Sequence, residues 1–376
     1  MTAFDFTFRT RLVFGPGSLA RLGGLARELG FRRVLLVVDH GLDATGHVPR
    51  AVRSLEDAGV AVALFQDFAE NPDSAMVAAG AAAAAAFGAD ALVGLGGGSS
   101  LDCAKGIAFV ATNGGTMADY RGYGKASRPL LPMIGVPTTA GTGSDAQSYA
   151  LVSDAETHRK MACGDPGAAF KVALLDPELT LTLPASVTAV AGYDALSHAV
   201  ETAVTTRRNA LSSAFSREAF RLLDGAYERV LDAPGDVSAR GDMLLGAFYA
   251  GLAVEASMLG AAHACANPLT ARHGTTHGVA VGLMLPAVVR WNGALVPGPY
   301  AELAALSGLT GGAAALADRL EALAVRGGLP RRLAAVGIAG DEIPLLAESA
   351  VLEWTGTFNP RPLDAPAARD LYQTVS

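Results

Sequence analysis

The sequence is poor in cysteine and in charge, and both shortages exclude classes of protein. Its three cysteines, Cys103, Cys163 and Cys265, lie far apart and cannot all pair, which argues against a disulfide scaffold and against a four-cysteine zinc site. Charged residues make up only 17% of the 376 residues and hydrophobic residues 51%, a composition that disordered chains do not have. We expect a soluble globular protein with free thiols.

Basic runs and long apolar runs are also missing. Lys and Arg total 29 against 36 Asp and Glu, giving a net charge of −7, and no five basic residues are consecutive, so no nucleic-acid partner is expected. The N-terminus has no basic region before an apolar one, and Arg9 and Arg11 interrupt it, which predicts a cytoplasmic location without a secretory signal. The charge-free stretches 75–89 and 274–289 are too short to span a bilayer, so no membrane association is expected. A small-molecule substrate is the default.

The first half alternates short apolar runs with alanine-rich helical stretches. This alternation predicts parallel strands joined by crossover helices, and therefore an α/β domain. The strands are expected at 34–38, 61–65, 91–95 and 133–136, with helices at 46–58 and 74–87.

The second half has a different pattern, and the length favours two domains. Long amphipathic segments at 210–231, 240–259 and 300–326 predict an all-helical region, with Pro184 at the entry to its first helix. We therefore expect an α/β domain over residues 1–182 and a helical domain over 183–376.

A glycine-rich loop follows the strand expected at 91–95 and precedes a helix expected at 103–110. Its sequence is Gly96-Gly97-Gly98-Ser99-Ser100-Leu101-Asp102. Glycines let backbone N–H groups approach a phosphate, and a helix N-terminus adds unpaired donors. The spacing departs from the usual dinucleotide fingerprint, and a tight structural turn explains the same glycines.

A second loop rich in hydroxyls, residues 137–145, follows the strand at 133–136 and contains Thr138, Thr139, Thr142 and Ser144. Two such loops at the carboxyl ends of strands favour a crevice for a long polar ligand. Asp39, at the end of another strand, suits a ribose diol and would repel a 2′-phosphate, which favours NAD over NADP. A helix-capping aspartate is an equally good interpretation of Asp39.

Asp194 and His198 are four residues apart, a spacing that places both side chains on one face of a helix. A surface pair would show the same spacing. His263, however, lies in a small apolar stretch where an unsatisfied imidazole is costly. His277 is fourteen residues further on, about 21 Å along an unbroken helix, so the chain must turn back between them, at Pro268 and Gly274. One carboxylate and three imidazoles suit a divalent transition metal.

As an ordered set, these residues resemble the iron-containing (group III) alcohol dehydrogenase family, over nearly the whole chain. The matching motifs also include 175–179, Glu201 after His198, His277-Gly278 and Asn359-Pro360-Arg361-Pro362. The resemblance implies a Rossmann-like dinucleotide-binding domain, a helical metal- and substrate-binding domain, and an NAD(P)-linked reaction in the cleft between them. It assigns Asp194, His198, His263 and His277 as ligands of Fe²⁺ or, in some members, Zn²⁺, places Lys160 and Asn71 near the cofactor, and implies a homodimer.

Three positions depart from the family pattern. Asn267 stands where many members have a histidine, and His273 is the candidate to replace it as a proton relay. Asp145 stands where Glu is usual, and Gln147 where Thr is frequent, so the resemblance does not transfer substrate choice.

The expected reaction is reversible hydride transfer between nicotinamide and a small alcohol or aldehyde (EC 1.1.1.-), because a bound metal lowers the pKa of an alcohol and polarises a carbonyl. Two alternatives remain at this level. One is a dehydroquinate-synthase-like cyclase, for which Arg207, Arg208, Arg272 and Arg290 are available. The other is a cofactor-binding protein without turnover.

Overall fold

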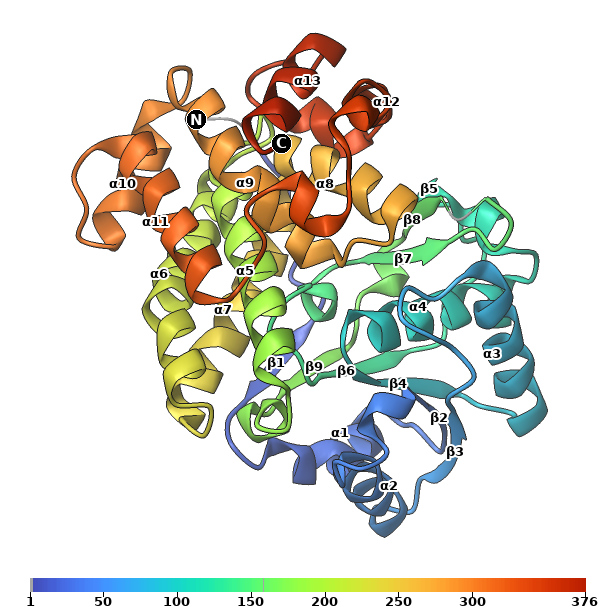
Figure 1. The fold of residues 1–376 in the computed structure, drawn as a ribbon. Coiled ribbons are helices and arrows are strands. Elements are labelled where there is room, and N and C mark those ends of the chain that lie inside the picture. Colours follow the sequence, from blue (N-terminus) through green and yellow to red (C-terminus); the bar gives the residue numbers. More distant parts are fainter. Residues whose placement is uncertain (1–2, 158) are drawn as a thin grey trace. The chain divides into compact units, whose positions relative to one another are not determined.

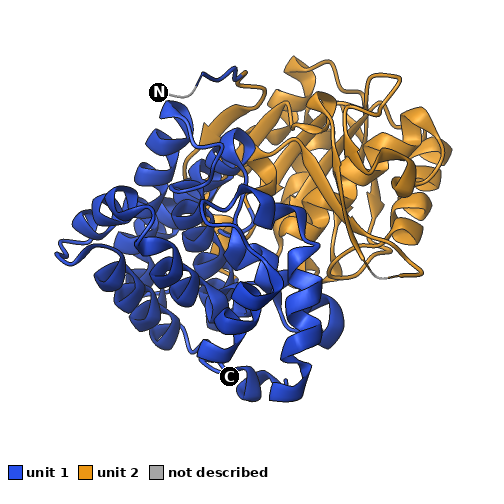
Figure 2. Ribbon diagram, turned by 90° about the horizontal axis from the view of Figure 1, so that it is seen from above, with its two compact units in different colours: residues 1–6, 140–142, 183–376 blue, residues 7–139, 143–182 orange. Residues whose placement is uncertain are grey.

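The structure is a computed structural model that describes residues 3–157 and 159–376. It divides into two compact units, which Figure 2 shows in two colours. The sheet unit comprises Thr7–Thr139 and Gly143–Thr182. The helical unit comprises Leu183–Ser376 with the short segments 140–142 and the described residues up to Phe6.

The sheet unit is built on a six-stranded parallel sheet (Figure 1). All of its strand pairs run parallel, as the alternation of strands and helices predicts. Its strands are, in spatial order, β1 (Arg11–Phe14), β9 (Val172–Leu175), β6 (Met133–Pro137), β4 (Ala91–Gly96), β2 (Arg33–Val38) and β3 (Ala61–Phe65).

Helices cover both faces of this sheet, because successive side chains of a strand point to opposite faces. On β2, Leu35 and Val37 join a core that contains residues of α3 (Ser74–Phe87) and α4 (Gly98–Asn113). Its alternate residues, Val34, Leu36 and Val38, join a second core with α1 (Leu22–Glu28) and α2 (His47–Asp57). The expected α/β class is confirmed.

The strand order reverses between β2 and β4. From β2 the chain passes to β3 on one side and then to β4 on the other. In open α/β sheets, ligands bind outside the carboxyl ends of the strands at such a reversal. Asp39 follows β2 and Gly97 follows β4, so both of these predicted cofactor residues lie at this point.

A small second sheet in the same unit was not expected from the sequence. It pairs β5 (Gly122–Tyr123) with β8 (Lys160–Gly164), and β8 with β7 (Tyr149–Ser153). β5 has only two residues, and β7 and β8 each have a polar residue at one end, Ser153 and Lys160.

The helical unit contains no strand in its described residues, as expected. Its first helix begins directly after Pro184. The helices are α5 (Ala185–Thr202), α6 (Ala210–Asp232), α7 (Val237–Ser257), α8 (Ala261–His273), α9 (His277–Gly293), α10 (Pro297–Leu306), α11 (Gly312–Arg326), α12 (Ile343–Val351) and α13 (Ala365–Thr374).

Three local expectations were wrong. The segment 300–326 is two helices, because Gly308, Gly311 and Gly312 adopt positive φ between them. Helix α4 begins at Gly98 instead of Cys103, so much of the glycine loop is helical. Pro268 lies inside α8 and does not end it; the break comes at Gly274, which has a φ of 64°.

In the described part of the chain, no single helix is long and apolar enough to cross a membrane. The bent pair α7 and α8 passes that test of length and composition together, with an angle of 105° between the two helices. Core helices of soluble proteins also pass this test, and most residues of both helices are buried in the unit.

Candidate metal centre and cofactor loops

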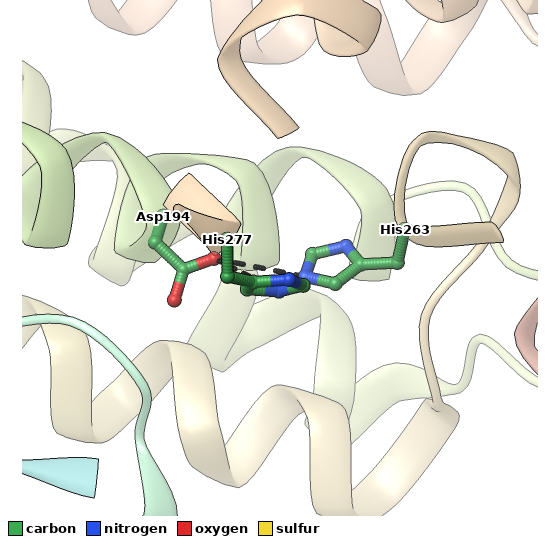
Figure 3. Close-up of side chains that lie close together, drawn as sticks. All are labelled: Asp194, His263 and His277. Atoms are coloured by element: carbon green, nitrogen blue, oxygen red, sulfur yellow. Dashed lines mark ion pairs between the residues drawn. The ribbon is translucent and has the colours of Figure 1, made fainter. Parts of the chain in front are cut away.

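Three helices of the helical unit bring the predicted metal ligands together. Asp194 and His198 lie one turn apart on α5, His263 is in the first turn of α8, and His277 is the first residue of α9. Figure 3 shows Asp194, His263 and His277 with their side chains directed at one another. The ligand atoms of these three residues all lie within 4.8 Å of one another.

One carboxylate oxygen is the centre of the cluster. Asp194 Oδ1 lies 3.7 Å from Nε2 of His198, 3.7 Å from Nε2 of His263 and 3.7 Å from Nε2 of His277. Asp194, His198 and His263 are buried, whereas His277 is partly exposed. Asp194 Oδ1 and His263 Nε2 are both buried without a hydrogen-bond partner. Buried polar atoms in proteins normally have one, so this pair calls for a ligand.

The donor set and its spacing fit a divalent transition metal. A separation of 3.7 Å is too long for a hydrogen bond. Metal bonds of about 2.0–2.2 Å in a tetrahedral arrangement place neighbouring ligand atoms about 3.4 Å apart, close to the spacing of this cluster. Imidazole nitrogens with one carboxylate oxygen are ligands that iron and zinc both accept.

The charges of the cluster also suit a cation. Burial alone would raise the pKa of Asp194, but the imidazoles around it hold that pKa well below its usual range. The carboxylate is therefore ionised at neutral pH, as a metal ligand must be. Burial acts to lower the pKa of His263, but Glu201 and Asp194 outweigh it and raise that pKa to about 9, so a bound cation would replace a proton of this imidazole. Burial lowers the pKa of His198 despite the nearby Asp194.

A glycine next to His277 allows two of these helices to approach closely. A Cβ on Gly278, at the start of α9, would lie 2.4 Å from the backbone oxygen of Val190 on α5. Backbone cannot give way as a flexible side chain can. Gly278 therefore lets His277 reach the face of α5 that carries Asp194.

Sequence reasoning missed the role of Glu201. This buried carboxylate of α5 accepts a hydrogen bond from Nδ1 of His263 at 2.5 Å and another from the backbone N–H of Ala262 at 2.7 Å. The available signal was its spacing, three residues after His198 and seven after Asp194, which places all three on one face of α5.

In the sheet unit, Asp39 connects the end of β2 to the start of α4. Its Oδ2 accepts a hydrogen bond from the hydroxyl of Ser100, on α4, at 2.9 Å, and its Oδ1 accepts one from the backbone N–H of Gly41. The capping role left open by the sequence is thus present, and it leaves the carboxylate beside the glycine loop. Gly96, with a φ of 146°, leaves no room there for a Cβ, which would lie 2.9 Å from Asp39 Oδ2.

Asn71, Ser99 and Lys160 also lie together. The backbone N–H of Asn71 donates to the Ser99 hydroxyl at 3.1 Å, and Lys160 Nζ donates to the Asn71 side-chain oxygen at 3.3 Å. Asn71 has a φ of 55°, a left-handed conformation that Asn tolerates better than most residues. Such strain often occurs at ligand sites.

The other predicted cofactor residues lie around the start of α4 and in the second polar loop. The backbone N–H of Thr138 donates to Gly96, and Thr139 lies next to Gly97. Ser144 donates to Asp102 at 2.6 Å. Gly97 precedes α4 without a side-chain cap, so the N-terminus that starts at Gly98 lacks a capping group. Thr142 lies in the segment 140–142, which is grouped with the helical unit.

A buried lysine, Lys105, was also missed. Its ammonium donates to the backbone oxygens of Ser144, Gln147 and Tyr149 at 2.6–2.8 Å. It therefore holds the second polar loop against α4. The sequence gave no local signal, because these acceptors are backbone atoms about forty residues away.

His273 is not brought to the metal cluster by its helix. It ends α8 ten residues after His263, about 15 Å along the helix axis. Its Nε2 lies 3.2 Å from a carboxylate oxygen of Glu342. Asn267, in the position where the resemblance expects a histidine, donates to Glu353 at 2.8 Å.

Comparison with known families matches both halves of the chain. The model "Iron-containing alcohol dehydrogenase" matches residues 9–177, and the model "Fe-containing alcohol dehydrogenase family, C-terminal" matches residues 188–375. The chain belongs to the iron-containing alcohol dehydrogenase family. The resemblance seen in the motifs is confirmed.

Individual members of the family are similar over almost their whole length. Alcohol dehydrogenase 4 of Schizosaccharomyces pombe is 34% identical, covering 93% of this chain and 83% of the relative. The NAD-dependent methanol dehydrogenase of Bacillus methanolicus is 32% identical, covering 93% of each chain. The crystal structure of a 1,3-propanediol oxidoreductase superposes with a TM-score of 0.96 at 31% identity, covering 100% of each chain.

These findings confirm the expected class of enzyme. The protein is an oxidoreductase of the iron-containing alcohol dehydrogenase family that acts on alcohols or aldehydes. The expected nicotinamide and divalent metal cofactors agree with the family, which is named for its iron, and with its NAD-dependent member. The matched family is not that of the cyclases.

Proposed function

We propose that this protein is an NAD-dependent, Fe²⁺-type alcohol dehydrogenase or aldehyde reductase for a small substrate. The observation that carries the proposal is the buried, unpartnered Asp194 Oδ1, which is 3.7 Å from each of three imidazole nitrogens. When bound, the metal would act as a Lewis acid on the oxygen of the alcohol or aldehyde.

Asp194, His198, His263 and His277 would hold the metal, with Zn²⁺ as the alternative ion. Three of these ligands are buried, which keeps water away from the cluster, and the partial exposure of His277 leaves a side from which substrate can enter. The four side chains fix the position of the ion because they project from three packed helices.

NAD would bind at the loops after β2, β4 and β6. The uncapped N-terminus of α4, from Gly96 to Ser99, would bind its pyrophosphate. The remaining contacts would come from Asp102, Thr138, Thr139, Thr142 and Ser144. Asp39 would accept hydrogen bonds from the ribose diol and would repel a 2′-phosphate, which is why NAD is preferred to NADP. Asn71 and Lys160 would contact the cofactor as a pair, and the Lys160 ammonium would bring positive charge to the reacting end.

His273 is proposed as the proton relay. Its separation from His263 along α8 means that it would act through intervening groups. The His273→Ala enzyme tests this role: loss of turnover with full metal content supports a relay, and wild-type turnover removes it.

The two units would bind different ligands. Residues 1–182 would bind the dinucleotide, and residues 183–376 would bind metal and substrate. We propose a homodimer in the cytoplasm, consistent with what the family resemblance implies.

The test is elemental analysis of protein purified without chelators, combined with nicotinamide absorbance assays over a panel of alcohols and aldehydes. We expect one metal ion per chain and net formation of NADH from simple alcohols. In His277→Ala, metal and turnover should be lost together, whereas His273→Ala should keep its metal. Full turnover in a metal-free variant would refute the proposal, and NAD binding without turnover would favour the cofactor-binding alternative.

A further inference from the structure

The carboxylate of Glu201 is fully occupied by one end of α8. Its Oε2 accepts from Nδ1 of His263 at 2.5 Å, and its Oε1 accepts from the backbone N–H of Ala262 at 2.7 Å. All three residues are buried. One carboxylate thus binds both the ring of a proposed metal ligand and the helix turn that carries that ring.

A second side chain holds the same helix end. The first four N–H groups of a helix lack partners within it, and Gly260, at the N-cap of α8, has no side chain to supply one. Asn359 Oδ1 accepts from the backbone N–H of Ala261 at 3.2 Å. Asn359 in turn forms a reciprocal pair of 2.9 Å hydrogen bonds with Asn292 on α9, the helix that begins with His277.

A larger residue at position 260 would press on both of these acceptors. A Cβ on Gly260 would lie 3.1 Å from Asn359 Oδ1 and 3.1 Å from Glu201 Oε1. Side chains distant in the sequence therefore replace the local N-cap of α8. A negative carboxylate is also favourable there, because it faces the positive end of the helix dipole.

The contact with Glu201 decides which ring nitrogen of His263 is free. An ionised carboxylate only accepts hydrogen bonds, so Nδ1 must carry the proton and donate it. Nε2 faces the cluster, 3.7 Å from Asp194 Oδ1, and is therefore the nitrogen that would bind the ion. Outer carboxylates that bind a ligating imidazole in this way orient the ring and raise its basicity.

We propose that Glu201 and Asn359 are positioning residues of the metal centre: together they clamp the N-terminus of α8 and set the tautomer and orientation of His263. Asn359 extends this clamp to the C-terminal motif Asn359-Pro360-Arg361-Pro362. The inference rests on the proposed metal site. Neither residue would bind the ion; both would act through His263 and the helix that carries it.

The test compares Glu201→Gln with Glu353→Gln, using the full-length protein. Glu353 is a matched control, because its carboxylate also binds a side chain of α8, Asn267, but touches no proposed ligand. The measurements are Co²⁺ affinity, by competition with a chromophoric chelator, and the visible spectrum of the Co²⁺-loaded protein. A purely structural role for Glu201 would lower the melting temperature without changing that spectrum.

For Glu201→Gln we expect Co²⁺ affinity to fall by about 10–100-fold and the Co²⁺ bands to shift, since the amide cannot accept both hydrogen bonds as the carboxylate does. Glu353→Gln should match the wild type in both. Wild-type affinity and spectrum in Glu201→Gln would overturn the inference while leaving the metal site itself intact. Failure of the wild type to bind Co²⁺ would overturn both the inference and the proposed function.

Should Glu201→Gln not fold, Asn359→Ala gives a second test, because it leaves Glu201 in place while removing the acceptor for Ala261 and the paired hydrogen bonds with Asn292. We expect a loss of Co²⁺ affinity of about tenfold or less, with altered Co²⁺ bands. Unchanged affinity and bands in Asn359→Ala would contradict the clamp.

Discussion

The two oxygens of Asp39 have separate partners, Gly41 and Ser100, and this arrangement fixes a negative charge beside the glycine loop. A 2′-phosphate placed near that charge would be repelled, whereas a ribose hydroxyl could donate to it. In the proposed function, a preference for NAD would therefore depend on one residue and could be changed by one substitution.

In Asp39→Asn the charge is lost while most of the shape is kept. We expect the ratio of kcat/KM for NADP to that for NAD to rise at least about tenfold, which corresponds to about 1.4 kcal/mol. Asp43→Asn is the control, because Asp43 is an exposed neighbour that binds His40 and Gln66. An unchanged ratio in Asp39→Asn would show that Asp39 does not face the ribose.

Asp145 is a buried carboxyl in the second polar loop, and burial raises its pKa to about 6. Between its unfolded value near 3.8 and about 6, the folded state binds more protons than the unfolded state. Folding is then weakened as pH rises through this range, by up to about 3 kcal/mol for a shift of two pKa units.

Asp145→Asn removes this pH dependence. Urea unfolding should show the variant more stable than the wild type at pH 8, with the advantage disappearing near pH 4. Asp67→Asn, at an exposed position, should leave stability unaltered at both pH values. A variant that is more destabilised at pH 8 than at pH 4 would mean that the Asp145 carboxylate is favourably paired in the fold, contrary to this prediction.

Individual residues were predictable where their partners are close in the sequence. The spacing of Asp194 and His198 sufficed to place them on one helix face, and the glycines of the loop pointed to close backbone approach. Glu201 and Lys105 were not found, because their partners lie 62 and about 40 residues away and include backbone atoms that carry no residue signature.

At the level of elements, the metal cluster depends on how closely α9 approaches α5. The helix starts at His277, and the next residue, Gly278, lies against the backbone of Val190. The packing of α9 thus sets where the His277 imidazole can reach.

Gly278→Ala should move the start of α9 away from α5. We expect a loss of stability of about 1–3 kcal/mol, from overpacking against backbone, together with weaker metal binding. Gly225→Ala is the matched control, since Gly225 is an exposed glycine of α6 with no atom within 4 Å of its added Cβ, and Ala there should be neutral or stabilising. Metal affinity in Gly278→Ala equal to that of Gly225→Ala would contradict the role of this contact.

Element types were predictable from periodicity, but their ends were not. The strand at 91–96 matches the expected apolar run closely, because a buried parallel strand is apolar throughout. Pro268 stays inside α8, where tertiary packing outweighs its local preference, and the glycine loop turns into helix earlier than its composition suggests.

On the scale of the whole molecule, we propose that the two units bind different ligands: the helical unit binds the metal and the sheet unit binds NAD. Ligands stabilise only the state to which they bind. Metal should therefore stabilise the helical unit, and NAD the sheet unit, because the proposed ligands of the ion all lie in one unit.

Removal of the metal by a chelator should lower the melting temperature of the helical unit, by the equivalent of about 3–4 kcal/mol when free metal had been 100–1,000 times its Kd. NAD should still bind to the chelated protein, as measured by calorimetry. Complete loss of NAD binding on chelation would show that the cofactor site depends on the metal, contrary to this account.

The fold class and the family followed from the order of motifs along the chain, because each motif belongs to a defined place in an α/β or helical unit. Substrate identity does not follow in the same way, since Asn267, Asp145 and Gln147 depart from the family pattern at positions near the expected site.

X-ray absorption spectroscopy of the Fe²⁺-loaded protein tests the central claim most directly. We predict one ion per chain with three imidazole nitrogens and at least one oxygen at about 2.0–2.2 Å, and no bound iron in His277→Ala. A spectrum that shows sulfur ligands, or fewer than three imidazoles in the wild type, would contradict it.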